Sequence, residues 1–183
     1  IAVNLVELTD DDPSSKVGQM KIYTQKNGRT PTGLTPVVTS AHTTRDIDLD
    51  VVFHRKVLQN ELLIDEVLSS EEQNEFLQLP RNAKTAVKFM QGNHMFGKIA
   101  LSQPLNYECH DMVPDGIAPN IGYISQAFEV HDLGFSEKAI SDLGCEIYNQ
   151  RRLVDFPGLG QIEIITVRAP GSGALQLIFQ SKG

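Results

Sequence analysis

Cysteine is scarce in this sequence, since only Cys109 and Cys145 occur among its 183 residues. Small domains that depend on disulfides contain many more, so the count favours a reducing compartment. We expect a cytoplasmic protein with two free thiols, and a disulfide between them is the alternative. No run of 18 apolar residues exists, so we expect no membrane-spanning helix. The first residues also lack the basic and apolar regions of a signal peptide.

Basic residues are fewer than acidic ones. The 16 Lys and Arg residues against 23 Asp and Glu residues give a formal net charge of -7. An acidic surface repels phosphate backbones and anionic lipids. We therefore expect neither nucleic acid nor a membrane as a partner. Hydrophobic residues make up 40% and charged residues 21% of the chain, which is typical of a globular protein.

A β-rich pattern with one main helix begins at residue 36 and ends at residue 105. Asp46 is placed to cap the start of the helix, because its side chain can accept hydrogen bonds from the first free N–H groups. The expected elements are a strand at 37–41, a helix at 47–58, and strands at 61–67, 86–90 and 97–101. Their order is β-α-β-β-β.

The same order returns between residues 120 and 183. Asp132 takes the place of Asp46, and Gly144 ends the second helix where a left-handed residue is favoured. The buried face of this helix is predicted to be Phe135, Ala139, Ile140 and Leu143. Strands are expected at 121–130, 146–154, 161–167 and 174–179.

This repetition predicts an α+β fold in which paired βαβββ modules form a cupped mixed sheet with a cleft between the modules. The expected divisions are modules at 36–105 and 120–183, a linker at 9–35 with a short strand at 17–24, a linker at 106–119, and, at 1–8, the last strand of a preceding, mostly absent module.

Four segments of the second module carry a resemblance to a known family. They are Phe128–Leu133, Leu143–Gly144, Phe156–Gly160 and Arg168–Ile178. In this order they resemble the vicinal oxygen chelate superfamily, which includes glyoxalase I, bleomycin-resistance proteins and extradiol dioxygenases. The resemblance covers about residues 121–180 and, more loosely, 36–105. It implies the glyoxalase/bleomycin-resistance/dioxygenase fold.

The resemblance also implies where a metal would bind. In the superfamily, His and Glu side chains of the first and last strands of paired modules hold a divalent metal, which leaves positions open for two vicinal substrate oxygens. Carried over by position, these ligands fall at Thr39 and Ala100 in the first module, at Ser125 and Gln176 in the second, and at Asn4 in the partial one. None is His, Asp, Glu or Cys. We therefore predict no metal and no other cofactor.

The predicted function is the binding of a small, partly apolar molecule in the cleft, without a chelated metal. Thr39, Ser125 and Gln176 would offer neutral hydrogen bonds, and Ala100 would line the cleft. An inward Arg151 would pair with an acidic ligand, although two solvated arginines at 151 and 152 are the alternative.

Two other functions stay open at this point. One is a metal-dependent lyase or dioxygenase whose active module pair includes a part upstream of residue 1. The other is an assembly domain, in which a homodimer or pairing with an upstream module covers the concave face. His42 lacks partners for a metal site in the sequence pattern. His54 is expected to pack in the core.

Overall fold

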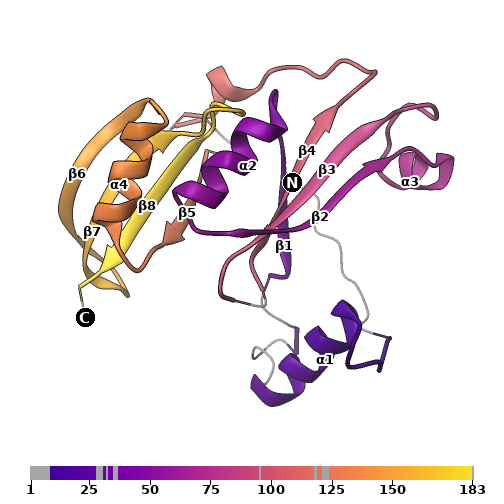
Figure 1. Cartoon of the computed structure of the whole chain (residues 1–183), viewed down its shortest axis with the longest axis horizontal. Coiled ribbons are helices and arrows are strands. Elements are labelled where there is room, and N and C mark those ends of the chain that lie inside the picture. The colour runs from indigo at the N-terminus through magenta and orange to yellow at the C-terminus, as the bar shows by residue number, and fades with distance from the viewer. Residues whose placement is uncertain are drawn as a thin grey trace.

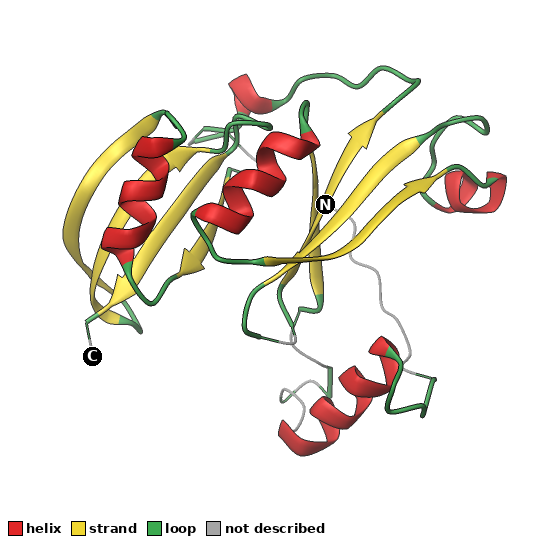
Figure 2. Cartoon of the chain, viewed as in Figure 1, coloured by secondary structure: helices red, strands yellow, loops and turns green. Residues whose placement is uncertain are grey.

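The computed structural model describes residues 9–27, 31, 33–34, 37–94, 96–117, 119–120 and 124–182. The strand predicted at 1–8, with Asn4, lies outside these residues. Two four-stranded mixed sheets form the body of the molecule, and a helix packs on each (Figure 1, Figure 2). Within the described ranges, no helix is long and apolar enough to cross a membrane. Cys109 and Cys145 are both free.

Both sheets have the predicted βαβββ order, so the predicted α+β class is confirmed. The first module contains β1 (Thr39–Thr43), α2 (Ile47–Lys56), β2 (Glu61–Leu68), α3 (Glu71–Phe76), β3 (Thr85–Gln91) and β4 (Lys98–Pro104). The second contains β5 (Ser125–Glu129), α4 (Leu133–Asp142), β6 (Ile147–Phe156), β7 (Gly160–Arg168) and β8 (Leu175–Ser181). The strand orders are β1-β4-β3-β2 and β5-β8-β7-β6. In each sheet the first strand runs parallel to the last, and the other pairs are antiparallel.

The two main helices begin at the predicted aspartates. The Asp46 side chain accepts hydrogen bonds from the backbone N–H groups of Asp48 and Leu49, at 3.1 and 3.0 Å. The Asp132 side chain accepts one from Phe135 at 3.0 Å. These bonds satisfy donors that have no partner inside the helix. The repeated sequence pattern is therefore also a repeated local structure.

A buried cluster joins the two modules on the side of the sheets that carries the helices. Phe53 of α2 and Val57, which follows α2, lie in it together with Ile140 of α4 and Ile178 of β8. The Ser136 hydroxyl on α4 donates a 2.7 Å hydrogen bond to the Val57 carbonyl. Because apolar burial is the main favourable term in folding, this shared core makes the stability of each module depend on the other.

Part of the predicted buried face of α4 is wrong. Phe135 is 48% exposed, whereas Leu133, Ser136 and Ile140 are buried. The buried face of α4 is therefore rotated by one residue from the predicted one, toward the polar Ser136. A hydroxyl can occupy this buried position because the Val57 carbonyl accepts its hydrogen bond.

The short strand predicted at 17–24 is wrong, because this segment forms the helix α1 (Lys16–Asn27). Met20 and Thr24 are buried and lie one helical turn apart, and the Thr24 hydroxyl donates to the Met20 carbonyl at 2.9 Å. Alternating apolar residues over so short a segment also suit a helix. α1 meets the β3–β4 connection through Tyr23, whose ring packs edge-on against His94 and Phe96 at 5.8 and 5.2 Å.

Asp50 of α2 binds the first module to the second. It is fully buried, and its Oδ1 atom accepts hydrogen bonds from the N–H groups of Gly171 at 2.9 Å and Ser172 at 3.2 Å, in the turn between β7 and β8. Glycine is required at 171, since a Cβ atom there would lie 2.0 Å from the Asp46 carbonyl oxygen. The buried Asp50 side chain thus holds the β7–β8 turn against α2.

Replacing Asp50 should destabilise the whole chain. Asp50→Ala leaves two buried N–H groups without an acceptor, so we expect the free energy of unfolding to fall by about 2–4 kcal/mol. Asp48→Ala is the matched control on the same helix, because the Asp48 side chain is 80% exposed and its ion pair is worth about 1 kcal/mol or less. Urea unfolding measures both. Equal losses in the two variants would contradict the role of Asp50.

His54 has the packing role predicted for it. It is 2% exposed, its ring meets Phe53 and Phe128 edge-on, and its Nδ1 atom lies 3.2 Å from the Asn60 side-chain nitrogen. Burial first, and then the nearby His42, lower the pKa of His54 from 6.5 to about 3. The folded chain therefore holds this imidazole in its neutral form.

The buried imidazole makes stability depend on pH. The unfolded chain takes up a proton near pH 6.5 and the folded chain only near pH 3, so this contribution is complete above pH 6.5 and is lost as the pH falls from there toward 3. The slope is at most about 1.4 kcal/mol per pH unit. Urea unfolding between neutral and acidic pH measures it, and His54→Gln should flatten the dependence. An unchanged slope in His54→Gln would assign the effect to other groups.

Candidate functional site

The first strands of the two modules meet edge to edge. The Gln126 side chain on β5 donates a 3.0 Å hydrogen bond to the Ser40 hydroxyl on β1. Gln126 shares a strand face with Phe128, whose ring lies 5.8 Å from that of His54 on α2. This is the helix face of the sheets, and the opposite face is called the open face below. The open face includes the exposed Ala41 and Ala127.

The strand register corrects the predicted equivalence between Ala100 and Gln176. Ala41 and Ala127 each lie five residues before the capping aspartate of their module. Ala41 pairs with Ala100, whereas Ala127 pairs with Leu177. Residues that lie directly opposite each other share a face. The counterpart of Ala100 in the second module is therefore Leu177, one residue beyond the predicted Gln176.

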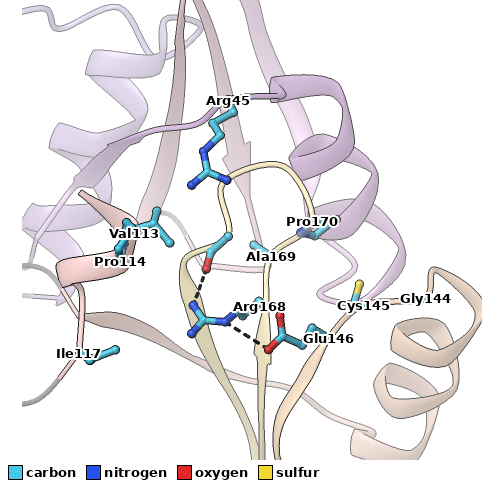
Figure 3. A pocket seen from close by; sticks show the side chains of 11 residues that line it. Arg45, Val113, Pro114, Ile117, Gly144, Cys145, Glu146, Arg168, Ala169 and Pro170 are labelled. Atoms are coloured by element: carbon cyan, nitrogen blue, oxygen red, sulfur yellow. Dashed lines mark hydrogen bonds and ion pairs between the residues drawn. The ribbon is translucent and has the colours of Figure 1, made fainter. Parts of the chain in front are cut away.

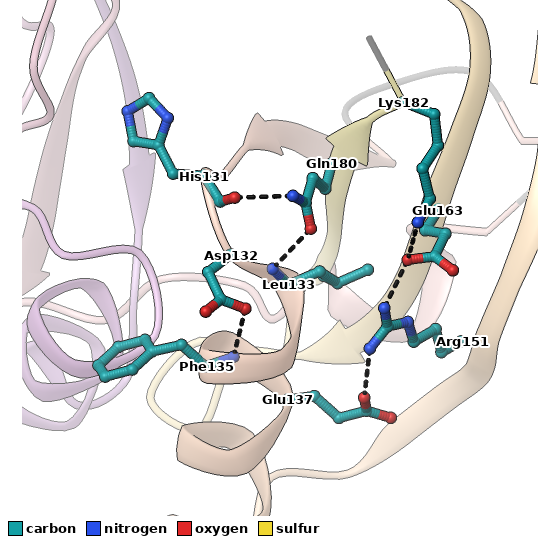
Figure 4. Close-up of polar contacts among 9 residues, drawn as sticks. All are labelled: His131, Asp132, Leu133, Phe135, Glu137, Arg151, Glu163, Gln180 and Lys182. Carbon is teal, nitrogen blue, oxygen red and sulfur yellow. Dashed lines mark hydrogen bonds and ion pairs between the residues drawn. The ribbon is translucent and has the colours of Figure 1, made fainter.

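Gln176 lies on the helix face of β8, with Ile178 and Gln180. It is fully buried, and neither of its amide atoms has a hydrogen-bond partner in the described part of the chain. Gln180 supports the corrected register, because its side chain accepts the first helical N–H of α4 at 3.1 Å (Figure 4). Gln103 accepts the first helical N–H of α2 in the same way, at 2.9 Å. Gln180 and Gln103 stand three residues after Leu177 and Ala100.

Arg151 also faces the helix side, so its predicted inward direction is wrong. Its guanidinium forms ion pairs with Glu137 of α4 and Glu163 of β7 (Figure 4). Hydrogen bonds from Arg151 and Lys182 hold the pKa of Glu163 below its usual value. The next residue, Arg152, pairs with Ile164 on the open face and is exposed. Of the two arginines, Arg152 is the one available to a ligand there.

Several solved structures have the same architecture as this chain. A glyoxalase family protein from Bacillus cereus superposes with a TM-score of 0.67 at 16% identity, covering 85% of this chain and 100% of that one. The chain has the vicinal oxygen chelate fold. A glyoxalase I mutant from Zea mays gives a TM-score of 0.56 at 14% identity, covering 80% of this chain and 46% of that one. The chain thus spans about half the length of the maize enzyme. No protein-family model and no curated protein sequence matches.

The residues at the ligand positions of the vicinal oxygen chelate superfamily do not fit a chelated metal. With the corrected register these positions are Thr39, Ala100, Ser125 and Leu177, all on the open face. Methyl and isobutyl groups cannot ligate, and neutral hydroxyls are poor ligands for Zn, Ni or Fe. Across the residues that the structure describes, no group of three or more His, Cys, Asp or Glu side chains is placed to hold a metal.

A second place of interest is a hollow where the two modules and their connection meet, named the junction pocket (Figure 3). Its volume is ≈ 580 Å³, and both modules contribute to it, through Arg45, which precedes α2, and through Arg168, at the end of β7. The connecting segment adds Val113 of the 3-10 turn η1 (Val113–Asp115). Burial raises the pKa of the Cys145 thiol in its wall, which makes it a weak nucleophile. No spacing in the sequence relates Arg45 to Arg168.

The two faces of β8 should respond differently to a new charge. Gln176→Glu places a carboxylate in the core without a donor among the described residues, so we expect a loss of about 3 kcal/mol or more. Leu177→Glu places it on the open face, where water can reach it, and should cost less than half as much. Urea unfolding of both variants measures the two losses of stability. A larger loss for Leu177→Glu than for Gln176→Glu would refute the corrected register.

Proposed function

We propose that the protein binds a small, partly apolar molecule on the open face between the two modules, without a chelated metal. The identity of the four side chains at the superfamily's ligand positions carries this proposal. Thr39 and Ser125 offer neutral hydroxyls, and Leu177 offers apolar contact, while Ala100 is largely buried beneath that face. Such a lining suits a ligand held by hydrogen bonds and apolar surface.

The exposure of the open face supports the same function. Ala41 and Ala127 lie at the centre of β1 and β5, and their small side chains are exposed. The exposed Arg152 adds a positive charge on that face of the second module, suited to an acidic group of the ligand. Together these residues provide space, apolar surface and one charge.

A second candidate is a metal-dependent lyase or dioxygenase of the same superfamily. It is motivated by the maize glyoxalase I chain, of which this chain covers 46%. In a longer protein of that kind, another module pair would supply the metal ligands. The cytoplasmic location, a homodimer and pairing with an upstream module also stay predictions.

Ligand screening with matched variants tests the binding function. A library of small aromatic and thiol compounds is screened by thermal shift, and positive compounds are titrated calorimetrically. Ala127→Trp fills the open face and should weaken a positive compound by about tenfold or more, equivalent to about 1.4 kcal/mol. Ser141→Trp, at an exposed position of α4, should leave affinity unchanged.

Two outcomes would overturn the proposal. One is the absence of any stabilising compound in the library. The other is stoichiometric Zn, Ni, Mn or Fe in the purified chain by elemental analysis, with a fall in the melting temperature when a chelator removes it. The second outcome would favour the metal-dependent candidate.

A further inference from the structure

Two guanidinium groups from different modules converge on one residue of the junction pocket. Arg168 Nη1 donates a 3.0 Å hydrogen bond to the Gly173 carbonyl (Figure 3). Arg45 Nη1 lies 3.8 Å from the point that a Cβ atom on Gly173 would occupy. Both guanidinium groups therefore line the pocket close to Gly173. A carboxylate in this pocket can accept charge-assisted hydrogen bonds from a guanidinium group.

The carboxylates that now accompany these arginines are largely in water. The side chain of Asp111, the partner of Arg45, is 48% exposed. The side chain of Glu146, 3.4 Å from Arg168 Nε, is 67% exposed. Ion pairs of this exposure contribute about 0–1 kcal/mol. A ligand carboxylate can therefore take the place of either partner at little cost.

Arg168 is already held in a fixed orientation. The Gly173 carbonyl accepts from its Nη1 atom, and its guanidinium lies 5.4 Å from the centre of the Tyr148 ring. Its Nη2 atom forms no hydrogen bond with any described residue. A guanidinium fixed in this way loses little side-chain entropy when it binds a carboxylate.

Apolar side chains line the pocket beside these charges. Val113, Pro114 and Ile117 come from the connecting segment, and Pro170 comes from the β7–β8 turn (Figure 3). Glycine at 173 keeps the wall open, because a Cβ atom there would lie 3.3 Å from a Val113 methyl group. The volume of ≈ 580 Å³ is within the range of small-molecule sites.

We propose that the junction pocket is a binding site for a small organic carboxylate with an apolar body. The carboxylate lies in the pocket against Arg45 and Arg168, and the apolar body lies against Val113, Pro114 and Pro170. None of these residues occupies a superfamily ligand position. The site is therefore additional to the open face and does not depend on the function proposed for that face.

Carboxylates and their neutral amides test the site directly. Benzoate, phenylacetate and 1-naphthoate are titrated calorimetrically at low ionic strength, each against the corresponding amide. We expect the carboxylate to bind about tenfold or more tightly than its amide, because only the charged group pairs with both guanidinium groups. Equal affinity of acid and amide, or no binding by any acid, would overturn the proposal.

Three single variants identify the site. Arg45→Gln should weaken carboxylate binding by about tenfold, and the variant should fold normally because the Arg45 side chain is 59% exposed. Asp111→Asn should strengthen it, because Arg45 loses its competing partner while an amide oxygen can still accept from Val113. Arg152→Gln, which removes a charge on the open face, should change nothing. An equal effect of Arg45→Gln and Arg152→Gln, or weaker binding in Asp111→Asn, would refute the assignment.

One further comparison separates this site from the open face. Ala127→Trp should leave carboxylate binding intact while it blocks compounds that bind the open face, and Arg45→Gln should do the reverse. Carboxylate binding that Ala127→Trp abolishes would place the ligand on the open face and overturn the junction site.

Discussion

The buried carboxylate of Asp50 is the interaction on which the arrangement of the two modules depends. It belongs to α2 of the first module, and both of its hydrogen-bond donors belong to the β7–β8 turn of the second. The same turn leads into β8, which carries Leu177 to the open face and Gln180 to the start of α4. It also includes Gly173, on which the two arginines of the junction pocket converge. One buried side chain thus links α2 to the turn that borders both candidate sites.

The order of helices and strands could be predicted from the sequence because it depends on local patterns, and these patterns occur twice. Asp46 and Asp132 begin helices through bonds to residues two or three positions away, so adjacent sequence is enough to place them. The direction of a strand side chain is harder to predict. A one-residue difference turns it to the other face of the sheet. Ala100 lies three residues after Gly97, whereas its counterpart Leu177 lies four residues after Gly173, so the two modules differ by one residue here. Only pairing with β5 reveals that Leu177, and not Gln176, corresponds to Ala100.

The other features that could not be predicted from the sequence depend on contacts between residues far apart in the chain. The direction of Arg151 is set by Glu137 and Glu163, which come from other elements of the same module. The junction pocket needs Arg45 and Arg168 together, 123 positions apart in the sequence and in different modules. Their proximity follows from packing of the β7–β8 turn on α2, for which no local pattern exists. Ser136 is similar, since its burial depends on the Val57 carbonyl of the other module.

The shared core has a consequence for how such a chain changes over evolutionary time. The buried residues that join the modules, with Phe53 and Ile178 among them, lie on the helix face, whereas Thr39 and Ala41 lie on the other side of the sheet. Substitutions on the open face therefore disturb few of the contacts that keep the chain folded. Exposed side chains of the open face can therefore be exchanged with less effect on folding than side chains of the shared core.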